Sequence, residues 1–236
     1  MALTDEAIEQ IRRLIRSGEL PPGSRLPPEQ ELAVQLGLSR NSMREAVKAL
    51  ELIRVLDVRR GDGTYVTSLE PRLLLEGLGL AVDLLQDESI LEVSEVRRLL
   101  EPLATGLAAE RASDADLERI GEHLAEMERA GHDIERQVQH DAAFHSSVFA
   151  ATGNQTLQSV LDGLSSRTLR ARIWRGLIES DATRDTLREH RAIYDALVAR
   201  DVAVAQAAAL MHVASSQRWL SGVLAARDEA AADASE

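Results

Sequence analysis

Four side chains in the second half of the chain have the types and spacing to bind a divalent metal ion. Asp141 and His145 lie four residues apart, on one helical face with the apolar Phe144. His190 opens another inward apolar stripe, and His212 lies in an alanine-rich run whose small side chains admit a close neighbour. Three imidazoles and one carboxylate offer nitrogen and oxygen ligands to a transition metal such as zinc, nickel or manganese.

Each of these residues also has a simpler interpretation. An inward histidine is often a hydrogen-bonded core residue, and Asp141 with His145 could form only an i, i+4 polar pair. A bound metal could activate water, as in a hydrolase, but no general base or nucleophile stands at motif spacing, and no glycine-rich phosphate loop is visible. The remaining histidines, His123, His132 and His140, follow no inward stripe and are expected at the surface.

A second set of side chains, in the first quarter of the chain, has the chemistry to contact DNA. The face of the third predicted helix that points away from its apolar stripe carries Arg40, Asn41, Arg44 and Lys48. Arginine can pair with guanine and asparagine with adenine, while cations neutralise phosphates, so this helix fits a major groove. The basic hairpin tip that follows adds Arg60, Gly61 and Gly63 as candidate contacts to the minor groove or to phosphates.

Three short helices and a hairpin are predicted to position these DNA contacts. The helices cover residues 4–16, 28–36 and 40–53. Gly37 supplies the left-handed residue that ends the second helix, and Ser39 caps the third. The β-branched runs at 55–58 and 64–67 indicate a hairpin. Together they predict a helix-turn-helix followed by a wing.

From about Pro71 onward the strand patterns vanish and helical periods take over. The predicted helices cover residues 72–86, 90–111, 114–129, 133–151, 155–178, 183–199 and 202–226. The fold class is therefore mainly α: an N-terminal winged helix-turn-helix, with three helices and a β-hairpin wing, followed by an all-α antiparallel bundle of six to seven helices.

The composition of the chain excludes some classes of chemistry and indicates where its charge lies. The chain has no cysteine, which excludes disulfides and thiolate chemistry, and neither a membrane span nor a signal peptide is visible, so the cytoplasm is the expected location. Its 27 basic and 39 acidic residues give a net charge of −12, which disfavours a nucleic-acid partner. However, residues 1–70 carry a net charge of −1, residues 71–236 carry −11, and residues 39–60 hold six cations and three anions. The acidity lies mainly in the helical part.

The first part of the chain resembles a known family. Residues 18–66, with ELPPGSRLPPEQELAVQLGLSRNSMREAVKAL and the ending RRGDGTYV, resemble the winged helix-turn-helix of GntR-family bacterial transcription regulators. The resemblance implies that Arg40 and Arg44 contact operator DNA and that a wing-tip glycine approaches the minor groove. Two positions depart from the family pattern: Gln30 stands where arginine is usual, and Arg54 stands where glycine is frequent. Both departures bear on operator preference or affinity rather than on the fold.

The helical part resembles the FadR-type effector domain (FCD domain). The runs that carry the resemblance are EVRRLLEPLATGLAA (95–109), HDAAFHSSVFAATGN (140–154), EHRAIYDAL (189–197) and ALMHV (209–213). It implies a central divalent ion held by Asp141, His145, His190 and His212, all of which are present. It also implies a small carboxylate or sugar acid as effector, with Arg97 as the partner of its carboxylate. A surface or interhelical salt bridge is the alternative for Arg97.

These expectations describe a ligand-responsive transcriptional regulator, not an enzyme. The regulator, in the repressor sense favoured by the family, is expected to bind double-stranded palindromic operator DNA as a homodimer. We assign residues 1–68 to the DNA-binding domain, 69–71 to a linker, 72–227 to effector binding and dimerisation, and 228–236 to a flexible tail. A hydrolase-like metalloenzyme and a purely structural metal in a dimerisation domain are the alternatives.

Overall fold

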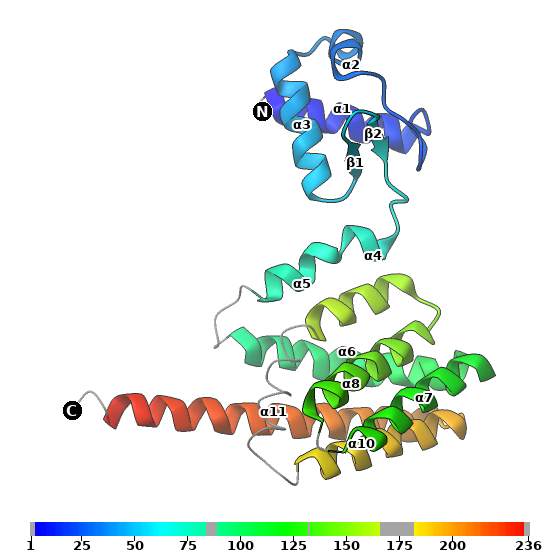
Figure 1. Ribbon diagram of the computed structural model, residues 1–236, viewed down its shortest axis with the longest axis vertical. Coiled ribbons are helices and arrows are strands. Elements are labelled where there is room, and N and C mark those ends of the chain that lie inside the picture. The colour runs from blue at the N-terminus through cyan, green and yellow to red at the C-terminus, as the bar shows by residue number, and fades with distance from the viewer. Residues whose placement is uncertain (1–2, 84–88, 132, 166–181, 234–236) are drawn as a thin grey trace. The chain divides into compact units, whose positions relative to one another are not determined.

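The chain folds into two units of different composition. A computed structural model describes residues 3–83, 89–131, 133–165 and 182–233. Met1–Gly77 and Leu78–Glu236 each contact mainly themselves (Figure 1). In the described residues, both β-strands belong to the first unit, and the second unit is helical. The predicted fold class is confirmed: a winged helix-turn-helix is followed by a helical bundle.

The three predicted helices of the first unit are present as α1 (Leu3–Ser17), α2 (Glu29–Leu36) and α3 (Arg40–Leu52). Gly37 ends α2 with φ +68°, a left-handed conformation in which glycine carries no Cβ penalty. The Ser39 side chain then accepts a hydrogen bond from the Ser42 backbone N–H at 3.0 Å and caps α3. Ile11 and Met43 are fully buried, and they join α1 to α3 through an apolar core.

The predicted hairpin is also present. Strand β1 (Leu56–Arg59) pairs antiparallel with β2 (Gly63–Val66), in a register that sets Arg59 opposite Gly63. Gly61 turns the chain at the tip with φ +78°, and the Asp62 N–H closes the turn on the Arg59 carbonyl at 3.0 Å. A single bridge from Arg25 to Tyr65 adds a third short strand position beside β2.

The helix predicted at residues 72–86 is interrupted. The structure has α4 (Pro71–Leu74) and α5 (Glu76–Asp83), separated by Leu75, whose φ of −97° and ψ of 2° leave the helical region. Gly77 lies in the first turn of α5, where glycine stabilises a helix less than other residues do. Residues 84–86 of that predicted helix fall outside the described residues.

The other helices of the second unit follow the predicted segments. They are α6 (Ser89–Arg111), α7 (Asp114–Ala130), α8 (Ile134–Ala150), α10 (Ala182–Val198) and α11 (Val202–Asp233), and residues 155–165 are helical as well. The later part of the helix predicted at 155–178 lies outside the described residues. Helix α11 continues to Asp233, seven residues beyond the predicted helix at 202–226, through alanine-rich sequence of high helix propensity.

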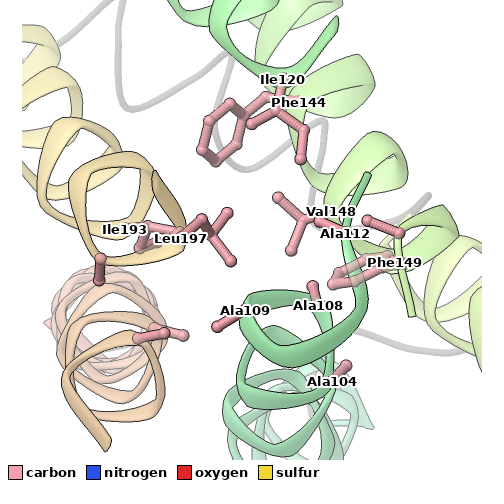
Figure 2. Packing of buried hydrophobic residues seen from close by; sticks show 14 of the residues in the cluster. Ala104, Ala108, Ala109, Ala112, Ile120, Phe144, Val148, Phe149, Ile193 and Leu197 are labelled. Atoms are coloured by element: carbon pink, nitrogen blue, oxygen red, sulfur yellow. The ribbon is translucent and has the colours of Figure 1, made fainter. Parts of the chain in front are cut away.

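Small residues let these helices pack closely. Alanines line the inner face of α6, and a Cβ at Gly106 would lie 2.5 Å from the Gln206 side chain of α11. Figure 2 shows Ile193 and Leu197 of α10 directed into the space between α10 and α6, with Val148 of α8 directed into it from the other side. Among the helices of the described residues, none has the length and apolar character needed to cross a bilayer.

Candidate functional site

The four predicted metal ligands come together inside the helical unit. Asp141 and His145 lie on α8, His190 on α10 and His212 on α11, so three helices supply them. All four are buried, with relative exposures of 6%, 4%, 0% and 2% in that order. Buried polar groups are stable only when they are paired, so the position of their nitrogen and oxygen atoms decides what the cluster can do.

The ligand atoms converge on one another. Nε2 of His190 lies 3.0 Å from Nε2 of His145 and 3.2 Å from Oδ1 of Asp141. One ring nitrogen from each histidine lies within 4.8 Å of those of the other two, and the centroids of the His190 and His212 rings are 4.6 Å apart. The donors therefore lie close enough to surround one small cation after small adjustments of the side chains.

The donor set fits a divalent transition metal. In the described residues, Nε2 of His212 is buried with no hydrogen-bond partner, which is costly for a polar atom unless an ion or a water satisfies it. Three imidazoles and a carboxylate suit zinc, nickel and similar first-row ions. The cluster can therefore hold a metal ion.

The inward faces arise from helical spacing, as predicted for α8. Asp141, Phe144 and His145 are all buried there, and Phe144 packs edge-on against the His190 ring with centroids 4.8 Å apart. On α11, Ala209 is buried three residues before His212. Its methyl group leaves room for the imidazoles of neighbouring helices, which explains why an alanine-rich helix carries the fourth ligand.

Sequence reasoning missed a carboxylate that contacts this cluster. Oε2 of Glu189 lies 3.0 Å from Nδ1 of His212, with side-chain exposures of 21% and 3%. Glu189 precedes His190 in the chain, but its partner belongs to α11, so only the packing of α10 against α11 reveals the contact. The spacing along either helix gives no signal for it.

Arg97, the predicted partner of an effector carboxylate, is buried on α6. Its Nε–H donates to the carboxylate of Glu101 one turn later, and the side chains are 3% and 2% exposed. Arg97 therefore forms a buried salt bridge within α6, whereas the alternative named a surface or interhelical one. Glu101 was also missed, although its i, i+4 spacing from Arg97 is a recognisable signal.

The other histidines differ from the prediction of surface positions. His123 on α7 and His140 on α8 are half-buried and face each other, with 3.2 Å between their Nδ1 atoms. Burial, followed by the neighbouring His140 ring, lowers the pKa of His123. Neither histidine lies on an apolar stripe of its own helix, because the two rings meet in the contact between α7 and α8. His132 lies outside the described residues.

The predicted DNA-contacting side chains share the exposed face of α3. Arg40, Asn41, Arg44 and Lys48 are exposed there, opposite the buried face that carries Met43. A guanidinium N–H of Arg44 donates to Oδ1 of Asn41 at 3.0 Å, and Lys48 pairs with Glu45 at 3.0 Å. These surface contacts are weak enough to be exchanged for contacts with bases or phosphates.

The wing has a cationic tip, and a hydrogen bond from Arg25 holds its turn in place. Arg60 and Gly61 are exposed at the tip, and Gly63 is half-buried with φ +155°. The guanidinium of Arg25 donates to the Asp62 carbonyl, and a Cβ at Gly63 would lie 2.5 Å from that guanidinium. Glycine suits position 63 through its backbone conformation, and a side chain there would require the Arg25 guanidinium to move.

The two departures from the family pattern have different structural settings. Gln30 is exposed in the first turn of α2, where a longer basic side chain would also fit. Arg54 has φ +60°, and the backbone N–H groups of Arg54 and Val55 donate to the carbonyls of Glu51 and Leu50. This is the Schellman motif that ends α3, in the position where glycine is most favourable.

A winged helix-turn-helix with an exposed cationic third helix, followed in the chain by a helical domain with a buried cluster of three histidines and an aspartate, is typical of DNA-binding regulators. Residues 3–66 match the bacterial regulatory proteins of the gntR family, and residues 92–215 match the FCD domain. The chain belongs to the GntR family, in the group that carries an FCD domain. Members of this group are transcriptional regulators, so the metalloenzyme alternative is not supported.

Relatives cover nearly the whole chain. It is 35% identical to the HTH-type transcriptional regulator LutR of Bacillus subtilis, over 89% of this chain and 97% of that protein. It is 34% identical to the galactonate operon transcriptional repressor of Escherichia coli, over 92% and 96%. Among solved structures, Streptococcus agalactiae GntR matches with a TM-score of 0.68 and 31% identity, over 91% of this chain and 99% of that one.

Proposed function

We propose that this regulator binds a palindromic operator as a homodimer and that a small carboxylate or sugar acid changes its DNA affinity by binding beside a divalent metal. The observation that carries the proposal is the convergence of Asp141, His145, His190 and His212 in the centre of the effector domain. A ligand can act only by binding one arrangement of the protein better than another. A buried centre shared by three helices is suited to that, because their packing responds to what it holds.

The DNA roles follow from the exposed face of α3 and from the wing. Arg44 and Asn41 are assigned to base edges, and Arg40 and Lys48 to bases or phosphates at the two flanks of that face. Arg60 is assigned to the backbone beside the minor groove, where the small Gly61 and Gly63 permit close approach. The exposure of the four α3 side chains supports this assignment.

The metal role is assigned to the four converging ligands. Zinc, nickel and manganese are the candidate ions, because nitrogen-rich sites bind several first-row metals and availability selects among them. When bound, the ion supplies positive charge for the carboxylate of an effector. Asp141 contributes the one negative charge among the four ligands, so a divalent ion held by them retains a net positive charge.

The effector class rests on chemistry and on one relative. The galactonate operon repressor is named for a sugar acid, which combines a carboxylate with hydroxyl groups. A metal with a net positive charge and the buried guanidinium of Arg97 are both suited to a carboxylate. Arg97→Gln alone would leave the Glu101 carboxylate buried and unpaired, so Arg97→Gln with Glu101→Gln is the informative variant.

The homodimer is supported by an apolar surface on α6. Val96, Leu99 and Leu103 follow i, i+3, i+7 spacing and are 40%, 61% and 57% exposed. Because residues three and seven apart share a helix face, the three exposed side chains form one apolar stripe along α6. We assign a second copy of the chain to this surface, because a palindromic operator has two half-sites and each half-site binds the winged helix-turn-helix of one chain.

One binding assay tests the DNA part of the proposal. Operator duplexes selected from a random pool are titrated by fluorescence anisotropy with wild type, Arg44→Ala and the matched control Arg12→Ala, which removes an exposed arginine of α1. We expect Arg44→Ala to weaken specific binding by roughly 10- to 100-fold, the value of one bidentate base contact, and Arg12→Ala to change it little. Sequence-independent binding that ignores Arg44→Ala would overturn the DNA assignment.

A second assay separates an effector-controlled metal from a structural one. The metal-loaded protein on its operator is titrated with D-galactonate, L-lactate and other small carboxylates, with the uncharged sugar galactose as control. We expect at least one acid to shift operator affinity in the wild type and to lose that effect in His190→Ala. If removing the metal lowers the melting temperature but no acid shifts operator affinity, the metal is structural only.

A further inference from the structure

Glu189 and His212 form a contact that fixes how one metal ligand is presented. Oε2 of Glu189 lies 3.0 Å from Nδ1 of His212, and the imidazole is 3% exposed. A carboxylate accepts hydrogen bonds, so the ring nitrogen facing it carries the proton. In the neutral ring, Nε2 is then the unprotonated atom and its lone pair points away from Glu189.

That second nitrogen is the one the cluster needs. Nε2 of His212 is buried without a hydrogen-bond partner in the described residues. A buried polar atom without a partner is costly. With the proton on Nδ1, the lone pair of Nε2 is available to a metal ion, which would satisfy this atom.

We infer that Glu189 is a positioning residue of the metal centre, which holds His212 in the Nδ1–H tautomer so that Nε2 is available to the ion. This inference rests on the proposed metal role of the cluster. Glu189 acts through His212 and is not itself assigned to the ion. A carboxylate behind an imidazole also makes the ligand more basic and fixes the ring orientation.

The location of Glu189 links two helices through the site. His190, the next residue of α10, faces the cluster with Nε2 3.2 Å from Oδ1 of Asp141. Successive helical residues point about 100° apart, so Glu189 reaches the Nδ1 side of His212 while His190 points into the cluster between α8 and α11. Two adjacent residues of α10 therefore supply one ligand and orient another, and a shift of α10 along α11 would disturb both.

Charge gives Glu189 a second effect on the ion. A divalent cation held by three neutral imidazoles and the Asp141 carboxylate keeps one positive charge. The Glu189 carboxylate, 21% exposed and hydrogen-bonded to a ligand, offsets that charge across the imidazole. Glutamine at position 189 can still accept the hydrogen bond but removes the charge, whereas alanine removes both.

The test measures zinc affinity in the full-length chain by competition with a chromophoric chelator. We expect Glu189→Gln to weaken zinc binding about tenfold and Glu189→Ala about a hundredfold, the range found for lost outer-sphere partners. Glu135→Gln, which removes an exposed carboxylate at the start of α8, is the matched control and should bind zinc like the wild type. Circular dichroism of each variant checks that the bundle is folded.

A spectroscopic measurement on the metal-free protein tests the tautomer directly. In nitrogen-edited NMR of histidine-labelled protein, His212 should show the Nδ1–H pattern in the wild type and lose it in Glu189→Ala. An Nε2–H pattern in the wild type, or zinc affinity unchanged in both Glu189 variants, overturns the inference. A wild-type protein that takes up no zinc overturns the proposed metal centre itself, whereas normal uptake with unaltered Glu189 variants overturns only the role of Glu189.

Discussion

Arg54 has a backbone conformation that suits glycine better than arginine. Its φ of +60° is required by the motif that ends α3 and directs the chain into β1. The left-handed region costs a residue with a Cβ about 1–2 kcal/mol, whereas glycine adopts it freely. The strain is a feature of this chain, since the family frequently has glycine at this position.

We therefore expect Arg54→Gly to raise the free energy of unfolding of the winged helix-turn-helix. The gain should be about 0.5–1 kcal/mol, because relief of strain is partly offset by the greater freedom of glycine in the unfolded chain. The surface ion pair of Arg54 with Glu76, at 3.1 Å, is lost in the variant but contributes little. Calorimetry of the full chain should show the transition of the first unit at higher temperature.

Two comparisons make the Arg54 prediction specific. Arg54→Ala removes the ion pair but keeps the Cβ, so it should give no stabilisation. Arg200 ends α10 in the same way with φ +57°, but its guanidinium donates to the Ala112 carbonyl. Arg200→Gly should therefore gain less than Arg54→Gly, or lose stability. An equal gain for alanine and glycine at position 54 would show that backbone strain is not the cause.

Single residues were predictable where a local rule fixes them. Gly37 and Ser39 follow from helix-end chemistry, and Asp141 with His145 follows from the 3.6-residue period. Glu189 could not be predicted in this way, because its role depends on a side chain of another helix. The partners His123 and His140 illustrate the same limit, since neither has a periodic signal along its own helix.

At the scale of elements, a metal in the cluster would join α8, α10 and α11. A ligand that binds only the folded state stabilises it in proportion to the logarithm of its concentration, by about 4 kcal/mol at a thousand times Kd. We expect zinc to raise the melting temperature of the second unit and a chelator to reverse this. In His190→Ala the zinc-induced shift should shrink strongly, because the cluster loses the ligand that lies nearest to both His145 and Asp141.

The control for this stabilisation is a histidine pair outside the cluster. His123→Gln on α7 removes one imidazole of the His123–His140 pair and leaves all four ligands in place. Its zinc-induced shift should equal that of the wild type. If His123→Gln and His190→Ala reduce the shift equally, the metal binds elsewhere or at several surface histidines.

Element boundaries were less predictable than element types. Helical periodicity located α6, α7, α8 and α10 to within a residue or two. It failed at Leu75, where apolar residues continue the pattern although the backbone leaves the helix. It also ended α11 too early, because acidic and alanine-rich composition indicates a solvated segment without excluding a helix. Periodicity locates a helix by its repeating apolar positions, and the sequence after residue 226 has no such repeat.

At the scale of the whole molecule, charge is divided between the two parts of the chain. Residues 71–236 carry a net charge of −11, and residues 1–70 carry −1, so cations available to DNA are concentrated on α3 and the wing. An acidic protein gains little from non-specific attraction to DNA. Operator affinity must then come from a few specific contacts, and a dimer doubles the number of these contacts in each complex.

The salt dependence of operator binding should differ between a dimer and a monomer. Each neutralised phosphate contributes about −0.9 to the slope of log K against log salt concentration. If the regulator binds as a homodimer, Lys48→Ala removes two cations per complex, so its slope should be shallower by roughly two; a monomer would lose roughly one.

Leu99→Glu with Leu103→Glu, on the proposed α6 surface, should weaken operator binding and yield monomers by light scattering. In that background Lys48→Ala should change the slope by only about one. A change of one in the wild-type background would contradict dimeric binding, and a dimer that survives both glutamates would assign the interface to another surface.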